Sequence, residues 1–237
     1  MDKIEELKKI IDESNNIVFF GGAGVSTESN IPDFRSTEGL YSQQYDYPPE
    51  TMLSHTFFIN HPEEFFRFHK NKMIFQDAKP NKAHIKIAEL EKQGKLKAVI
   101  TQNVDGLHQK AGSKNVLELH GSINRNYCMK CGKEYSLDFI VSSKGVPVCE
   151  CGGIVRPDVV LYEEALDNSV LSRAMGYIRD AEVLIVGGTS LVVYPAAGLI
   201  DYYIRKNLVL INKTSTPMDA KADLIITGSI GEIFSMI

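Results

Sequence analysis

Four cysteines are the residues of this 237-residue chain whose spacing most directly indicates chemistry. Cys128 and Cys131 form one close pair, and Cys149 and Cys151 form a second pair after seventeen intervening residues. Two such pairs can supply four thiolates to one tetrahedral zinc ion, with no cysteine left over. Because four sulfur ligands leave no open coordination position, we expect the metal to be structural. Four unrelated buried thiols are the less favoured alternative.

Polar side chains also gather where two consecutive apolar runs end. The stretch 101–108, TQNVDGLH, follows one run, and Leu119-His120-Gly121 follows the next. At consecutive strand ends, two such clusters can converge on one ligand. The alternatives are ordinary loop roles, since Asn and Asp in loops commonly form turns and a lone histidine is more often structural.

A glycine-rich stretch, Gly21–Ser36, follows the first apolar run of the chain. Gly22 and Gly24 would let backbone amides approach a pyrophosphate, and a helix starting there would direct its positive end at the same charge. Thr27 stands where a third glycine is expected, so an ordinary strand-to-helix turn explains the glycines about equally well. The continuation Ile31-Pro32-Asp33-Phe34-Arg35 favours a nucleotide pocket, because a tight turn would bring a ring and a guanidinium beside the loop. Core packing of the ring is the alternative.

Hydrophobic patterning predicts the elements that must position these residues. Six short runs rich in Ile, Val and Leu are expected to be strands, at 17–20, 97–101, 116–119, 183–186, 208–211 and 224–227. Amphipathic helices are expected between them, at 83–93, 166–179 and 196–205. This alternation predicts an α/β fold with a Rossmann-like, doubly wound parallel sheet. Its ligand site should lie beyond the carboxyl ends of the strands.

Two stretches interrupt the alternation of strands and helices. Residues 36–80 are rich in Tyr, Phe, His and Pro and are expected to form a helical insertion, with Pro62 near the start of a helix that reaches Phe75. Residues 124–156 hold every cysteine and are expected to form a smaller inserted zinc-binding module. The Rossmann-like domain should therefore comprise residues 1–123 and 157–237, including the helical insertion.

Composition restricts the partners and the compartment of the chain. The net charge of −4 lacks the basic excess of a phosphate-backbone binder, so we expect no direct nucleic-acid partner. The first fifteen residues place apolar side chains at helical spacing among charges, unlike the continuous apolar core of a secretory signal. No stretch approaches the roughly 20 apolar residues of a membrane span. We therefore expect a cytoplasmic protein without membrane contact, where a reducing environment favours metal over disulfides.

Several motifs, in order along the chain, resemble those of the sirtuin family. The glycine-rich stretch resembles GAGxSxxSGIPDFR, the polar clusters around Asn103 and His120 match the family pattern, and residues 156–164 resemble RPxVVxFGE. Residues 188–191 and 210–212 resemble the GTSL element and the strand whose Asn meets the adenine ribose. Asn30 replaces a glycine, but Asn readily adopts left-handed backbone angles, so we expect the loop to be kept. Tyr162-Glu163 replaces Phe-Gly, a change expected to narrow or redirect the substrate groove.

The resemblance implies a site for NAD and for an acylated peptide. Asp105 would hold the nicotinamide carboxamide, Asn103 would orient the ribose and a water molecule, and Ile230 would cover the adenine. Val160, Leu161 and Val193 would contact the substrate, with Val160 and Phe34 as walls of an acyl-lysine tunnel. The implied NAD-binding residues are Gly22, Ala23, Gly24, Thr27, Phe34, Arg35, Gln102, Asn103, Val104, Asp105, His120, Gly188, Thr189, Ser190, Asn212, Lys213 and Ile230.

The implied reaction is removal of an acyl group from protein lysines, in which NAD is consumed. The acyl oxygen attacks the ribose carbon that bears nicotinamide and forms an alkylimidate. His120, the implied general base, then activates a ribose hydroxyl, because an imidazole with a pKa near 6.5 is neutral at physiological pH. Water completes the hydrolysis, and the products are lysine, nicotinamide and O-acyl-ADP-ribose. His120 and Asn103 are thus the implied catalytic residues, whereas His108 is expected to be structural.

The substrate and the alternatives can be narrowed further. Residues 40–67 lack the Tyr and Arg pair that marks sirtuins favouring negatively charged acyl groups, so acetyl or another neutral acyl group is expected. A mono-ADP-ribosyltransferase and a non-catalytic NAD or ADP-ribose sensor are the alternatives. Both are disfavoured because Asn103 and His120, the pair that deacylation needs, are both present. We expect a monomer that holds one structural zinc ion.

Overall fold

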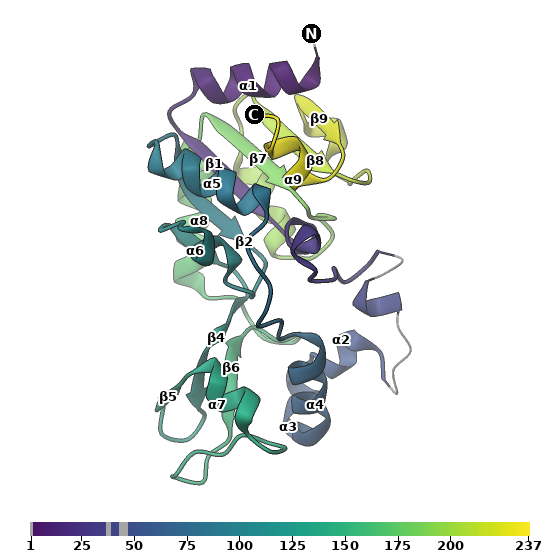
Figure 1. Ribbon diagram of the computed structural model, residues 1–237, viewed down its shortest axis with the longest axis vertical. Helices are drawn as coiled ribbons and strands as arrows, with labels where there is room; N and C mark the ends of the chain where they lie inside the picture. Colours follow the sequence, from purple (N-terminus) through teal and green to yellow (C-terminus); the bar gives the residue numbers. More distant parts are fainter. Residues whose placement is uncertain (1, 37–38, 43–46) are drawn as a thin grey trace.

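A parallel six-stranded sheet forms the centre of the larger part of the molecule (Figure 1). The computed structural model describes residues 2–36, 39–42 and 47–237. The strand order is β3-β2-β1-β7-β8-β9, so the order reverses between the neighbouring strands β1 and β7. The strands are β1 (Ile17–Gly21), β2 (Leu96–Thr101), β3 (Val116–Glu118), β7 (Val183–Gly187), β8 (Leu208–Asn212) and β9 (Leu224–Thr227). All six predicted strands and the doubly wound order are confirmed.

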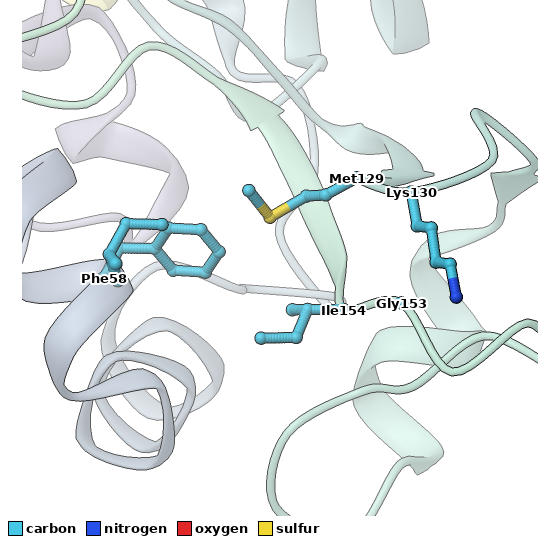
Figure 2. A pocket seen from close by; sticks show the side chains of 6 residues that line it. Phe58, Met129, Lys130, Gly153 and Ile154 are labelled. Atoms are coloured by element: carbon cyan, nitrogen blue, oxygen red, sulfur yellow. The ribbon is translucent and has the colours of Figure 1, made fainter.

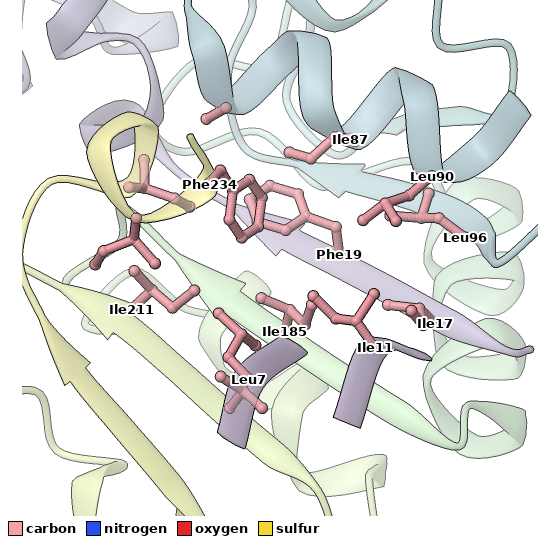
Figure 3. Close-up of a cluster of buried hydrophobic side chains, with 14 of the residues drawn as sticks. Leu7, Ile11, Ile17, Phe19, Ile87, Leu90, Leu96, Ile185, Ile211 and Phe234 are labelled. Carbon is pink, nitrogen blue, oxygen red and sulfur yellow. The ribbon is translucent and has the colours of Figure 1, made fainter. Parts of the chain in front are cut away.

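Helices cover both faces of this sheet, because successive side chains of a buried strand point to opposite sides. On one face, Phe19 and Ile185 pack against helices α1 (Lys3–Glu13), α5 (Lys82–Lys92) and α9 (Ile230–Phe234), as Figure 3 shows. On the other face, strand residues such as Phe20 pack against α8 (Asn168–Asp180) and the 3-10 helix η4 (Ala196–Tyr202). Two apolar cores therefore hold the strand ends in fixed positions.

The third amphipathic helix predicted from the sequence, 196–205, is wrong in type. The segment is a 3-10 helix that ends at Tyr202, although its apolar side chains face the core as expected. Gly198 lowers the α-helix propensity of the segment. The next residue, Tyr203, has an extended backbone, and its hydroxyl donates to the Lys206 carbonyl oxygen over 2.6 Å.

A smaller region carries a three-stranded antiparallel sheet of order β5-β4-β6. It comprises β4 (Gly121–Cys128), β5 (Glu134–Tyr135), helix α7 (Leu137–Ser142) and β6 (Val155–Val159). Beside it lie helices α2 (Pro49–Met52), α3 (His55–Asn60) and α4 (Pro62–Lys72), which the 3-10 turn η3 (Leu40–Ser42) precedes in the chain. Figure 1 shows α2, α3 and α4 alongside this sheet, below the six-stranded one. Within the predicted insertion 36–80, residues 37–38 and 43–46 lie outside the described residues.

One apolar core unites the helical insertion with the cysteine-bearing sheet. Phe58 and Phe66 belong to the same buried cluster as Cys128, Ile140 and Val155. The expectation that residues 36–80 belong with the larger domain thus differs from the packing of their buried side chains. We therefore propose that the insertion and the module around 124–156 form one structural unit.

The structure also bears on membrane association. In the part of the chain that the structure describes, no helix combines the length and the apolar character needed to cross a bilayer.

Two histidines lie in the core beneath the sheet's carboxyl edge. His84 and His108 are 0% and 1% exposed, and their ring centroids are 4.7 Å apart. Burial lowers the pKa of His84 to about 4 and, together with the neighbouring imidazole, that of His108 to about 3. Because a charged imidazole would lose its hydration there, the fold holds both rings neutral. This agrees with the structural role expected for His108.

These depressed pKa values make stability depend on pH. Below about pH 6.5 the two histidines bind protons in the unfolded chain but not in the folded protein. Their contribution to the free energy of unfolding is therefore fully present above that pH and falls as the pH drops toward 4. Between pH 7 and pH 5, each histidine should cost about 2 kcal/mol of unfolding free energy. Replacing His108 with Met should remove one such contribution.

The measurement is urea denaturation of wild type and His108→Met at pH 7 and pH 5. The difference between the two pH values should be smaller in the variant. An equal difference in both proteins would mean that the buried ring is already charged at pH 5.

Candidate active site

The loops that follow β1 and β7 meet where the strand order reverses. The Gly24 N–H donates to the Gly188 carbonyl oxygen over 2.8 Å. A Cβ atom on Gly24 would lie 2.8 Å from the Gly188 Cα, and one on Gly22 would lie 2.7 Å from the Thr189 Cβ. The two loops therefore approach too closely for side chains at these positions. In an open α/β sheet this reversal point is the expected crevice for a nucleotide.

The glycine-rich segment differs from its predicted form in one respect. The α-helix expected after Gly24 is absent, and two 3-10 turns, Ala23–Val25 and Thr27–Ser29, stand in its place. Without an α-helix, an anion bound here would meet loop amides rather than a helix end. The expectation that Asn30 keeps the loop is confirmed. Asn30 has φ 62° and ψ 27° and takes the left-handed conformation that the usual glycine would provide.

Ser26 joins two of the predicted site residues and was not itself predicted. Its hydroxyl donates to Asp105 Oδ2 (2.7 Å) and accepts from Asn103 Nδ2 (3.1 Å). The Asn103 N–H donates in turn to Thr101 Oγ1, at the end of β2. Ser26 occupies the serine of the GAGxS pattern, which was the available signal.

Asp105 is a largely buried carboxyl group with two donors. Burial raises its pKa, while hydrogen bonds from the Leu107 N–H and the Ser26 hydroxyl act in the opposite direction, and the net shift is upward. A carboxyl group of this kind suits recognition of a neutral donor such as an amide.

His120 follows β3 and has a defined tautomer. Its Nδ1 lies 2.9 Å from the Gln102 carbonyl oxygen. Since a carbonyl oxygen only accepts, Nδ1 carries the proton and Nε2 keeps its lone pair. Within the described residues Nε2 has no hydrogen-bond partner. Burial lowers the pKa of His120, opposed by the Gln102 hydrogen bond, so the ring is a neutral base at pH 7.

A second set of predicted residues is linked on the β7 and β8 side. Gln102 Nε2 donates to Thr189 Oγ1 (3.0 Å), and the Thr189 N–H donates to Asn212 Oδ1 (2.9 Å). Asn212 Nδ2 is buried and has no partner among the described groups. A buried donor without a partner is costly unless a ligand satisfies it, so Asn212 fits a nucleotide hydroxyl or ring nitrogen.

The other predicted nucleotide residues line the same edge without such links. Ser190 and Lys213 are exposed, and no hydrogen bond joins either to the described parts of the site. The Ile230 side chain packs directly on Gly187, at the end of β7. Ala23 and Thr27 lie in the 3-10 turns described above, and Val104 accepts a hydrogen bond from the Ile123 N–H.

Phe34 and Arg35 lie on a tight turn, as expected. Asp33 Oδ1 accepts from the Arg35 and Ser36 N–H groups at 3.1 and 2.8 Å. The Phe34 ring meets the edge of Tyr41 with centroids 5.6 Å apart, and the Arg35 guanidinium lies 5.2 Å from the Tyr41 ring centroid. Phe34 is half-buried: its ring packs against the core cluster that contains Phe58, as the core-packing alternative expects, and part of its surface stays exposed.

The predicted substrate segment contacts His120 through the backbone. The Val160 N–H donates to the His120 carbonyl oxygen (3.0 Å), which places Val160 and Leu161 beside β3 and β4. Val193 lies beyond β7 in a separate segment, and no hydrogen bond joins it to Val160. The structure therefore joins one of the three predicted substrate residues, Val160, directly to His120. Leu161, the next residue, is 4% exposed and packs in the apolar core that contains Phe58.

A buried ion pair shapes this segment. Arg156, 7% exposed, donates to both oxygens of Glu164, at 2.7 and 3.0 Å. Burial would raise the pKa of Glu164, but Arg156, the Leu161 N–H and His55 lower it to about 2. A paired, fully hydrogen-bonded charge is the condition under which burial of ions is tolerated. The pair closes the loop that presents Val160.

Glu163 occupies the position where the related motif has glycine. It takes a left-handed conformation, with φ 77°, which is uncommon for a residue other than glycine. Its carboxylate accepts from the Thr56 N–H (2.8 Å) in the first turn of α3, where a negative charge is favourable. The substitution therefore keeps the backbone path and adds a contact to the helical insertion.

The four cysteines form a compact cluster. Their sulfur atoms all lie within 4.8 Å of one another, and the pairs 128–151 and 131–149 are separated by 3.5 and 3.6 Å. Zinc–sulfur bonds of about 2.3 Å in a tetrahedron place sulfur atoms about 3.8 Å apart. These separations are too long for disulfides and fit a tetrahedral zinc site with four cysteine ligands.

A separate pocket lies between α3 and the cysteine module (Figure 2). It has a volume of about 290 Å³ and is lined by Phe58, Ile59, Met129, Lys130, Gly153 and Ile154. Its walls are chiefly apolar and include none of the residues at the sheet's carboxyl edge. It is therefore distinct from the site around His120.

Comparison with known proteins finds one family at the level of both sequence and structure. The model of the Sir2 family matches residues 22–195. A Clostridium acetobutylicum protein named NAD-dependent protein deacetylase is 63% identical over 241 residues, covering 100% of this chain and 98% of its own. A Sir2 structure with a deacetylated p53 peptide and 3′-O-acetyl ADP-ribose has a TM-score of 0.91 at 40% identity, covering 98% of this chain and 96% of that one. Sir2 with a p53 peptide and NAD+ gives 0.87 at 42%, covering 98% and 95%.

The cysteine cluster predicts one zinc ion per chain. Cys149→Ser should lose the metal and unfold at lower temperature, because zinc binding at a structural site is coupled to folding. Lys144→Ala, at an exposed position of the same module, is the control and should keep both metal and stability. Elemental analysis and thermal melts of the purified proteins provide the readout. A folded wild-type protein without zinc would contradict the assignment.

Proposed function

Since this chain belongs to the Sir2 family, we propose that it is an NAD-dependent protein deacetylase that removes acetyl groups from lysine side chains. NAD is a co-substrate and is consumed. The observation that carries the proposal is the state of His120: Nδ1 is fixed on a carbonyl oxygen, Nε2 is free, and the backbone contacts Val160. A neutral imidazole held in this way is a general base ready to accept one proton.

The proposed roles on the nicotinamide side follow from the Ser26 network. Asp105 and Asn103 share the Ser26 hydroxyl, so one side chain holds both at fixed orientation. Asp105 would accept from the nicotinamide carboxamide, and Asn103 would orient the ribose and a water molecule. NAD supplies the reactive ribose carbon, and nicotinamide is its leaving group.

His120 would act on the ribose. Its Nε2 takes the proton of a ribose hydroxyl, while the Gln102 carbonyl stabilises the imidazolium through Nδ1. The lowered pKa of His120 keeps the ring neutral before this step. Because proton transfer needs contact at hydrogen-bond distance, the position of the ring matters as much as its pKa.

The remaining roles concern the adenosine and the substrate. Asn212 Nδ2, the buried donor without a partner, would bind the adenosine portion together with Thr189. Val160, Leu161 and Val193 would contact the acyl-lysine peptide. We further propose acetyl or another neutral acyl group as the substrate, and a cytoplasmic monomer that binds neither nucleic acid nor membranes.

The proposal predicts strict dependence of nicotinamide release on acylated lysine. Incubation with NAD and an acetyl-lysine peptide should give free lysine, nicotinamide and O-acetyl-ADP-ribose, and added nicotinamide should inhibit. Mass spectrometry of the products is the measurement, with the unacetylated peptide as control. ADP-ribosylated protein as the main product would favour a transferase instead, and formation of NADH would rule out this chemistry.

Separate substitutions of His120 and Asn103 should have different effects. His120→Ala should reduce deacetylation about a hundred- to ten-thousand-fold, because removal of a general base has effects of that size. NAD binding and the fold should persist, and nicotinamide exchange should survive in part, since departure of nicotinamide needs no base. Asn103→Ala should weaken exchange and deacetylation together, because it removes the orientation of the ribose.

Both variants should be assayed side by side for exchange of labelled nicotinamide and for peptide deacetylation. Gln109→Ala, an exposed position on helix α6 (Leu107–Ala111), is the matched control. Near-native deacetylation by His120→Ala would show that the imidazole is structural.

A further inference from the structure

Asn81 belongs to none of the motifs described above, yet it lies between helix α5 and the glycine-rich loop. Its side-chain oxygen accepts from the Ala83 N–H (2.9 Å) and the His84 N–H (3.5 Å), and thereby caps α5. Asn is a preferred N-cap residue because its oxygen satisfies donors that have no partner within the helix. The cap uses only the oxygen of the side-chain amide and leaves its nitrogen free for other partners.

The nitrogen of the same amide holds the loop. Asn81 Nδ2 donates to the Val25 carbonyl oxygen (2.7 Å) and to Ser29 Oγ (3.0 Å). These two residues belong to the consecutive 3-10 turns, and Ser26, between them, is bonded to Asn103 and Asp105. One planar amide thus connects a core helix to the loop that contacts Asn103 and Asp105.

The other attachments of the loop lie elsewhere. The Gly24 N–H bonds to the Gly188 carbonyl on the β7 side, and the Glu28 carboxylate accepts from the Gly231 N–H of α9 (2.7 Å). On the α5 side, the described part of the loop accepts side-chain hydrogen bonds from Asn81 Nδ2, at the Val25 carbonyl oxygen and Ser29 Oγ. Loss of Nδ2 would leave the Val25 carbonyl without its partner.

We propose that Asn81 is a positioning residue for NAD, which holds the glycine-rich loop in the conformation that receives the pyrophosphate. This inference rests on the proposed function for the identity of the ligand. The cap and the loop contact use different atoms of the side chain. They can therefore be separated by substitution.

Asn81→Asp separates the two contacts most sharply. A carboxylate caps α5 as well as an amide does and suits the positive end of the helix, but it has no proton to donate to the Val25 carbonyl. Asn81→Ser also keeps a capping oxygen, without adding charge. Both variants should fold with melting temperatures close to wild type, whereas Asn81→Ala should lose the cap as well.

Two measurements test the loop. In ligand-free protein, hydrogen exchange of the amides in residues 22–30 should become faster in Asn81→Asp and Asn81→Ser, while exchange within α5 stays as in wild type. The KM for NAD should rise about threefold to tenfold, as expected for loss of a net hydrogen bond, while the KM for the acetyl-lysine peptide stays within about twofold.

The control removes a cap that has no contact with the loop. Asp167 caps α8 by accepting from the Ser169 and Val170 N–H groups at 2.7 and 3.0 Å. Asp167→Ala should lower the melting temperature and leave the KM for NAD unchanged.

The outcomes separate this inference from the proposed function. If amide hydrogen exchange in residues 22–30 were as slow in both Asn81→Asp and Asn81→Ser as in the wild type, the role of Asn81 would be overturned, whatever the activity of the enzyme. A wild-type protein that fails to deacetylate would overturn the proposed function, while the exchange data would still decide whether Asn81 holds the loop. A rise in both KM values, or in neither, would also count against a specific role toward NAD.

Discussion

The contact between the loops after β1 and β7 is the constraint on which the site depends. Parallel strands whose order reverses at this point bring both loops to one edge, and Gly24 can donate to Gly188 only because neither residue carries a side chain. With the loops fixed together, Ser26 reaches Asn103 and Asp105 after β2, and Thr189 reaches Gln102. The arrangement of the site follows from backbone packing before any ligand is present.

The second part of the molecule depends on the buried pair of Arg156 and Glu164. The guanidinium satisfies the carboxylate and also the Val159 carbonyl, and its carbon atom lies 5.4 Å from the Phe58 ring centroid. His55 of α3 contacts the same carboxylate. This charge pairing therefore connects the helical insertion, the cysteine-bearing sheet and the segment beside His120.

The features of the fold and site that could be predicted from the sequence are those encoded in local patterns, repeated patterns or motifs. Periodic apolar runs gave the six strands, and the cysteine spacing gave the cluster, because each depends on residues close along the chain. The 3-10 turns after Gly24 and the shared core of Phe58 with Cys128 depend on tertiary packing, which composition does not reveal. Ser26 was visible in the motif, whereas Asn81 was not, since its side chain joins backbone groups 2 and 3 residues ahead to groups 52 and 56 residues earlier in the chain.

The shared core of the helical insertion and the cysteine module has a wider consequence. Cys128 and Cys149 are buried in the same cluster as the phenylalanines of α3 and α4, so the side chains that bind the metal also pack against the insertion. Segments that share a core tend to open as one cooperative unit. Zinc supply in the cell would then set how long the helical insertion and the cysteine module together resist proteolysis, although a structural zinc ion takes no part in the chemistry.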